Sequence, residues 1–64
     1  MIPKITYRPE DNAAYLRLSP AKALDSAEVS RDVVFDYDAE GRIVGIEFLD
    51  ARSQLSADLL AEAA

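Results

Sequence analysis

The sequence predicts an α+β domain, with about four antiparallel strands arranged as two hairpins and one C-terminal helix packed on one face of the sheet. Two runs of β-branched and aromatic residues flank a turn sequence at residues 38–41, and two shorter alternating runs precede them. The last part of the chain instead places its leucines at helical spacing. With 64 residues, the whole chain (1–64) is expected to form a single domain.

The N-terminal part predicts the first hairpin. Residues 4–8 alternate with period two, residues 9–12 (PEDN) are typical of a turn, and residues 13–18 alternate again. In the second run Tyr15 and Arg17 share the face that points away from the core, toward solvent or a partner. Residues 19–25 contain a proline and no sustained period, which indicates a connection. Residues 26–30 are either a separate strand or the start of the strand that ends at Tyr37, with a bend or bulge at 30–32, and we favour the second interpretation.

The second hairpin is predicted around a type I turn that ends in a left-handed Gly41. In that register Asp38 faces Arg42, Tyr37 pairs with Ile43 and Phe35 pairs with Gly45. The other expected pairs are Val33 with Glu47, Asp36 with Val44, Val34 with Ile46 and Asp32 with Phe48. Apolar residues then lie on both faces of the hairpin, so each face needs a cover.

The C-terminal segment predicts one helix from Ala51 to about Ala63, with Asp50 as its N-cap. Leu55, Leu59, Leu60 and Ala63 fall on one side of it. So short a helix is marginal in isolation, and its leucine stripe must therefore dock on a sheet face.

The composition excludes several classes of function. The chain contains neither Cys nor His, which excludes disulfides, a thiol nucleophile, the usual zinc ligand sets and a Ser-His-Asp triad. The net charge is −5 and the basic residues are scattered singly, which disfavours direct binding of nucleic acid. No stretch approaches the roughly 20 apolar residues of a membrane span, and the N-terminus lacks the features of a secretory signal, so we expect a cytoplasmic protein without a membrane partner.

An acidic stretch between Asp36 and Glu47 comes close to a calcium-binding loop. Acidic residues occupy loop positions one, three, five and twelve (Asp36, Asp38, Glu40 and Glu47), and a glycine occupies position six. A calcium or magnesium site, or an enzyme based on these carboxylates, is therefore the alternative function. The flanks have strand rather than helix periodicity, and the predicted register places Asp36 and Glu47 on opposite faces, so a plain turn is favoured. We assign no catalytic residue, cofactor or metal ligand.

The leading hypothesis is a non-enzymatic interaction module that forms a homodimer. One short helix can cover only one face of the sheet, which leaves apolar side chains exposed in a monomer. We expect the helix on one face and the dimer contact on the face that carries Phe35 and Tyr37. The candidate interface residues are Tyr15, Arg17, Val33, Phe35, Tyr37, Ile43 and Leu49.

Two segments together resemble a known bacterial family, the domain of unknown function 2283. They are YRPEDNAAYLRL at residues 7–18 and VVFDYDAEGRIVGIEFLDA at residues 33–51, and the likeness covers about residues 5–55. Arg8 replaces the acidic residue expected before the proline, and Phe35 stands where leucine is common. The resemblance implies a stand-alone domain with no assigned activity, cofactor or catalytic residues. By analogy, it also suggests a small neighbouring protein as a partner, which such a domain would neutralise like an antitoxin.

Overall fold

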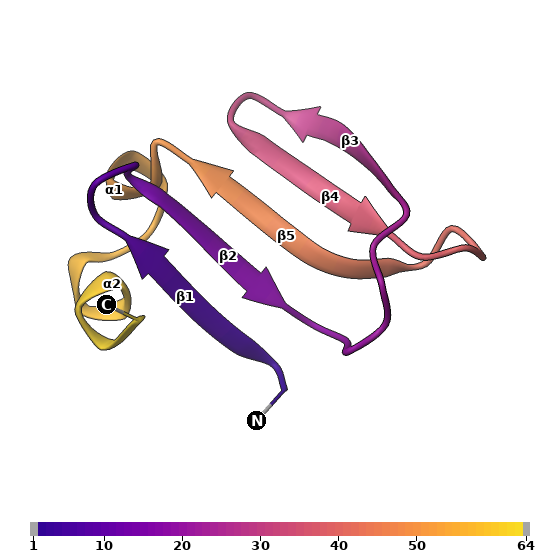
Figure 1. Ribbon diagram of the computed structural model, residues 1–64. Helices are drawn as coiled ribbons and strands as arrows, with labels where there is room; N and C mark the ends of the chain where they lie inside the picture. Colours follow the sequence, from indigo (N-terminus) through magenta and orange to yellow (C-terminus); the bar gives the residue numbers. More distant parts are fainter. Residues whose placement is uncertain (1, 64) are drawn as a thin grey trace.

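The computed structural model describes residues 2–63 and contains one antiparallel sheet with two short helices (Figure 1). The strands are β1 (Lys4–Arg8), β2 (Ala13–Arg17), β3 (Asp25–Ser30), β4 (Val33–Tyr37) and β5 (Ile43–Leu49), and the helices are α1 (Ala51–Gln54) and α2 (Ala57–Ala63). The strand order is β1-β2-β5-β4-β3. The α+β class and the antiparallel sheet are confirmed, but the described residues form five strands and two helices rather than about four strands and one helix. Neither of these helices has the length and apolar composition needed to cross a bilayer.

Strand β3 is the additional strand, and the favoured interpretation of residues 26–30 was therefore wrong. β3 runs antiparallel to β4 from its own hairpin, in which Ser30 lies opposite Val33. The chain reverses within Arg31 and Asp32, and Asp32 adopts a φ of 62°. A short polar side chain tolerates this left-handed conformation, so a tight turn replaces the expected bend. β3 forms an exposed outer edge of the sheet.

The turn between β4 and β5 follows the prediction. The Asp38 amide donates to the Arg42 carbonyl at 2.9 Å, and the Gly41 amide donates to the Asp38 carbonyl at 3.1 Å. Gly41 has a φ of 79°, which glycine adopts without steric cost. The Asp38 carboxylate also accepts hydrogen bonds from the amides of Glu40 and Arg42, each at 2.9 Å. The expected pairing of Tyr37 with Ile43 is confirmed.

Beyond that first pair the register shifts by one residue, and the other predicted pairs of this hairpin were wrong. Val44 has no partner in the ladder, so Asp36 lies opposite Gly45. The carbonyl of Val44 instead accepts hydrogen bonds from the amides of Leu18 and Ser19, at 2.9 and 3.2 Å. This arrangement is a β-bulge, which places one extra residue in β5. The pairs that follow are Phe35 with Ile46, Val34 with Glu47 and Val33 with Phe48.

The shift places most of the large apolar residues of the hairpin on one face. Side chains at paired positions share a face, so Ile46 and Phe48 join Phe35 instead of opposing it. Glu47 moves to the other face, where it joins Asp36. Val34 and Leu49 remain on the other face, so both faces carry apolar residues as expected, but in unequal number. We call these the Phe35 face and the Tyr15 face, because Tyr15 lies opposite Glu47.

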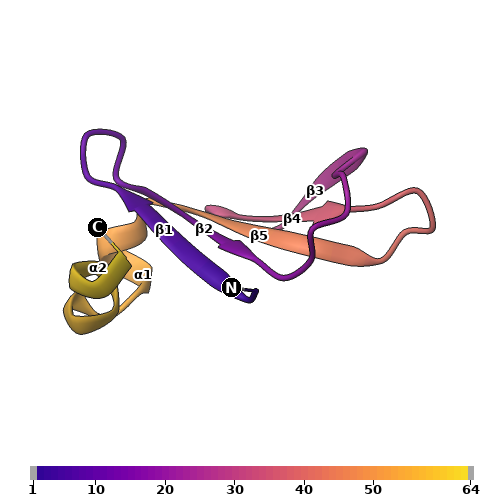
Figure 2. The same ribbon diagram turned by 60° about the horizontal axis from the view of Figure 1, so that its bottom comes forward.

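The helices pack on the Phe35 face, not on the opposite face as expected. Ala14, Ala51 and Leu60 form the buried centre of the core, and Ile5, Tyr7, Phe48 and Leu55 pack around them. The sheet residues of this cluster are paired in the ladder on the side that carries Phe35. The helices cover only the end of the sheet near the turn from β1 to β2, and β3 and β4 extend well beyond them (Figure 2). The covering of the Phe35 face is therefore partial.

The predicted continuous helix is interrupted at Leu55, which has extended backbone angles (φ −117°, ψ 149°). The hydroxyl of Ser56 accepts a hydrogen bond from the Leu59 amide at 3.3 Å, so Ser56 caps a second helix. Leu55, at the interruption, and Leu60, in α2, both pack in the core, whereas Leu59 remains 37% exposed. The leucine stripe therefore docks in two pieces, which a straight helix of this length would not allow.

Asp50 occupies the N-cap position of α1 as predicted, but Asn12 supplies the capping hydrogen bonds. The Asp50 side chain makes no capping hydrogen bond. The Asn12 carbonyl accepts from the Ala51 amide at 2.9 Å, and its side-chain oxygen accepts from the Arg52 amide at 3.0 Å. Its side-chain nitrogen donates to the Asp50 carboxylate at 3.0 Å. A residue from the turn between β1 and β2 thus satisfies amides that a helix cannot pair within itself.

Replacing Asn12 with glycine should lower the free energy of unfolding by about 1–2 kcal/mol, a typical cost of losing a helix cap. Glycine keeps the left-handed backbone at this position (φ 51°) and removes only the side-chain bonds. Urea denaturation followed by circular dichroism measures the change. An unchanged midpoint and slope would contradict the capping role.

Replacing Gly45 with alanine should cost about 1–3 kcal/mol because of overpacking. A methyl group there would collide with the phenol oxygen and Cζ of Tyr15 and lie 2.9 Å from Cε1 of the same ring. The cost should shrink when Tyr15→Ala is added, and a double-mutant cycle by urea denaturation measures that coupling. Additive effects of the two substitutions would show that the ring does not occupy this space.

Candidate functional site

The structure divides the seven predicted interface residues between the two faces of the sheet. Three of them lie on the Tyr15 face. Tyr15 pairs with Glu47 and Arg17 pairs with Gly45, and Leu49 lies two positions after Glu47 in β5. The other four lie on the Phe35 face, namely Val33, Phe35, Tyr37 and Ile43. The rings of Phe35 and Tyr37 are neighbours there, with centroids 6.5 Å apart and planes tilted by 60°. One contact surface cannot contain all seven residues.

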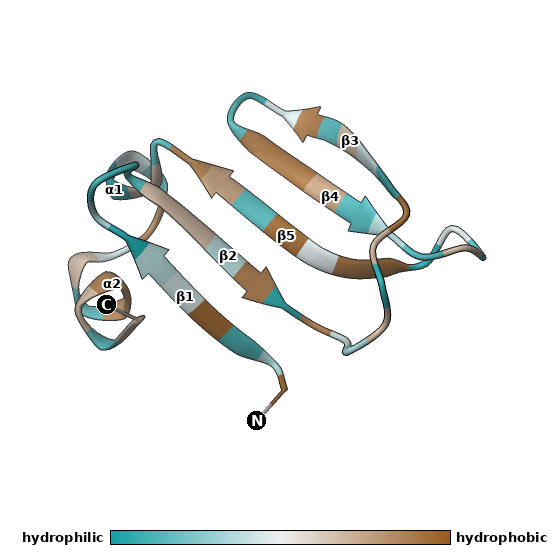
Figure 3. Cartoon of the chain, viewed as in Figure 1, coloured by the Kyte–Doolittle hydropathy of each residue, from teal (hydrophilic) through white to brown (hydrophobic). Residues whose placement is uncertain are grey.

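The part of the Phe35 face beyond the helices carries an apolar surface, which we call the open patch. Its members are Leu16, Phe35, Tyr37, Ile43 and Ile46, which are neighbours in the ladders of β2, β4 and β5. None of them belongs to the core cluster under the helices. Apolar segments along β4 and the adjoining part of β5 are visible in Figure 3. Ile43 remains 42% exposed, and the other four are only partly buried.

The Tyr15 face carries a cluster of three acidic or phenolic side chains, formed by Tyr15, Asp36 and Glu47. Asp36 is its buried member, with 8% exposure. Burial, a hydrogen bond with Asp36 and the negative charge of Asp36 raise the pKa of Glu47. Burial and the charge of Asp36 also raise the pKa of Tyr15, although the Arg17 guanidinium, 5.5 Å from the ring centroid, acts in the opposite direction. The negative charge of Asp36 therefore contributes to the raised pKa of both neighbours.

Two structural features bear on the calcium-loop alternative: the face on which Asp36 and Glu47 lie, and the hydrogen bonds of Asp38. Asp36 and Glu47 lie on the same face, so the prediction of opposite faces was wrong, because the bulge at Val44 moves Glu47 across. The Asp38 carboxylate, however, is occupied by backbone amides of its own turn. Within residues 2–63, no three acidic side chains converge as metal ligands would. The structure thus places a turn at residues 38–41 and brings Asp36 and Glu47 to one face.

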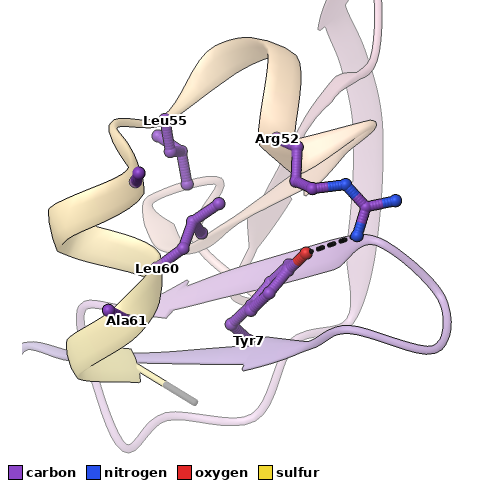
Figure 4. Close-up of a pocket in the computed structure, with 6 residues that line it drawn as sticks. Tyr7, Arg52, Leu55, Leu60 and Ala61 are labelled. Carbon is purple, nitrogen blue, oxygen red and sulfur yellow. Dashed lines mark hydrogen bonds between the residues drawn. The ribbon is translucent and has the colours of Figure 1, made fainter.

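A pocket of about 400 Å³ lies between the helices and β1 (Figure 4). Its lining consists of Tyr7, Arg52, Leu55, Ala57, Leu60 and Ala61. The Arg52 guanidinium donates to the Tyr7 hydroxyl at 3.1 Å, and that hydroxyl donates to the Asn12 side-chain oxygen at 3.3 Å. Both polar groups of the pocket are therefore held in place by the residue that caps α1.

This pocket was not predicted from the sequence, although one signal was present. Arg52 has no acidic residue three or four positions away, where a helical arginine usually finds its partner. The apolar walls come from both short helices, and their meeting depends on the break at Leu55. A continuous helix does not create that junction.

These features define a small antiparallel α+β domain with one partly covered apolar face. The model of one protein family matches residues 4–52, which is most of the chain. The protein belongs to this family, described as a protein of unknown function (DUF2283). The match includes all five strands and ends within α1, so α2 lies beyond it. No curated protein and no solved structure matches the chain.

Replacing Glu47 with glutamine should stabilise the protein more at pH 7 than at pH 4, relative to wild type. The folded protein holds the Glu47 proton to higher pH than the unfolded chain does, so wild type loses stability as pH rises through this range. Glutamine has no proton to lose. Urea denaturation at several pH values measures the difference, and Asp36→Asn should weaken its pH dependence. A difference that falls with rising pH would contradict the raised pKa.

Proposed function

We propose that this protein is a non-enzymatic interaction module that associates with a second copy of itself through the open patch. The observation that carries the proposal is the partial cover of the Phe35 face. The helices pack at one end of the sheet, while five apolar side chains of β2, β4 and β5 remain only partly buried beyond them. A contiguous apolar patch on a small domain is typical of a protein contact.

The small size of the core supports the same proposal. Among the described residues, the buried hydrophobic side chains are Ala14, Val44, Ala51 and Leu60. The chain exposes 4425 Å², whereas a folded monomer of 7.0 kDa is expected to expose about 4,000 Å². Burying a large apolar side chain fully contributes roughly 1.5–3 kcal/mol, which is considerable against a total stability of about 5–15 kcal/mol. Association would supply burial that one copy lacks.

The composition of the open patch favours a two-fold contact between identical copies. Its two aromatic rings and three aliphatic side chains contain no charged group, so a second copy meets it without charge repulsion. A two-fold axis is the commonest way to bury a self-complementary patch. The Tyr15 face is less suited, because it carries Asp36, Glu47 and Arg17. A small partner protein on the same patch, as in an antitoxin pair, is the competing arrangement.

Sedimentation at micromolar concentration should show a dimer of twice 7.0 kDa. Ile43→Ser should weaken the dimer at least tenfold, and Leu49→Ser should not. The two positions make a matched pair, because their exposures are 42% and 44% and they lie on opposite faces. Circular dichroism shows whether each variant is folded.

Only a 7.0 kDa species would contradict self-association and favour a different partner. A dimer that Leu49→Ser weakens, while Ile43→Ser leaves it intact, would place the contact on the Tyr15 face. Phe35→Ser tests the centre of the patch in the same measurement.

A further inference from the structure

We propose that the pocket between the helices and β1 binds a small amphipathic monocarboxylate, with its apolar tail between α1, α2 and the Tyr7 ring and its carboxylate on Arg52. This site is separate from the open patch and does not depend on self-association.

The walls of the pocket suit an alkyl or aryl group. Leu60 of α2 and Leu55, in the connection between the helices, line the pocket beside the Tyr7 ring, and two alanines, Ala57 and Ala61, leave space that larger side chains would fill (Figure 4). The volume of about 400 Å³ falls in the range of roughly 300–1,000 Å³ that is usual for small-molecule sites. Such sites combine apolar walls with a few fixed polar groups, as here.

Arg52 provides the charge that selects the head group. Its backbone amide is bound by Asn12 and its guanidinium by the Tyr7 hydroxyl, so the side chain is positioned by two contacts. Neither contact supplies a negative charge. The ion pairs of residues 2–63 join Arg8 to Glu10 and Asp11, and Arg31 to Asp32, and none of them involves Arg52. The remaining guanidinium N–H groups can bind a carboxylate in the two-bond geometry that arginine favours.

The charge balance of the chain narrows the ligand class further. The net charge of −5 repels anions in general, and most strongly those with several charges such as phosphates. Among residues 2–63, Arg52 is the one charged side chain that lines the pocket. One guanidinium in an acidic protein therefore favours an anion with a single charge, bound largely through its apolar part.

Three probes with the same tail test the assignment, namely octanoate, octanol and octylammonium, titrated into the isotope-labelled protein and followed by amide chemical shifts. Octanoate should shift the amides of Arg52, Leu55, Leu60 and Ala61 and bind several-fold more tightly than either other probe. Non-specific adsorption to a chain of charge −5 would instead favour octylammonium. Equal affinities for the three probes, no saturable response, or shifts centred on Phe35 and Ile43 would overturn the proposal.

Matched variants separate the head group from the tail. Arg52→Gln should weaken octanoate about five- to tenfold and leave octanol unchanged, which also shows that the pocket is intact. Arg31→Gln, at the exposed turn between β3 and β4, should change neither affinity. Ala61→Leu should fill the pocket and weaken all probes that bind there. Octanoate affinity that survives Arg52→Gln unchanged would refute the assignment of the head group.

The dimer variant makes the two proposals independent. Ile43→Ser should retain octanoate binding, since Ile43 does not line the pocket. Loss of the dimer with intact octanoate binding would support both proposals, and a monomeric wild type that binds octanoate would leave only the pocket standing.

Discussion

The bulge at Val44 determines which side chains share a face of this sheet. Val44 has no partner in β4 and is 1% exposed, and on the β2 side its carbonyl accepts hydrogen bonds from the amides of Leu18 and Ser19. Every residue of β5 after it then changes face relative to a regular hairpin. The apolar core, the open patch and the carboxyl pair of Asp36 with Glu47 all follow from that one displaced residue.

The sequence was sufficient for the sheet class and for the turn at residues 38–41, because turn chemistry is local. Asp38 and Gly41 form that turn through contacts within a few residues. The register of β4 with β5 could not be predicted from the local sequence, since the residues around the bulge also contact the segment that follows β2. One indication was available: the regular register divides the large apolar residues between both faces, whereas a shift of one residue brings Ile46 and Phe48 to the face of Phe35.

The missed parts of the fold share a physical cause, which is reliance on distant partners. The amides of α1 are capped by a side chain 40 residues earlier, so no local pattern could identify Asn12 as the cap. The helix break at Leu55 follows from docking two leucines on one core, which helical periodicity does not report. β3 alternates polar and apolar residues only over positions 26–30, and this short run did not distinguish a strand of its own from the start of the next strand. The predicted interface set was divided because it relied on the unshifted register.

The central position of β5 next to β2 has a consequence for the order of folding. Ala13 pairs with Leu49, so the two halves of the sheet join only when residues far apart in the chain have met. Closing that loop costs entropy before the contacts within it stabilise anything. The hairpin of β1 and β2 and the three-stranded unit of β3, β4 and β5 can form early and separately, but α1 waits for Asn12 and Asp50 to be brought together by this pairing. The final turns of the chain are thus added to a finished sheet and do not serve as its nucleus.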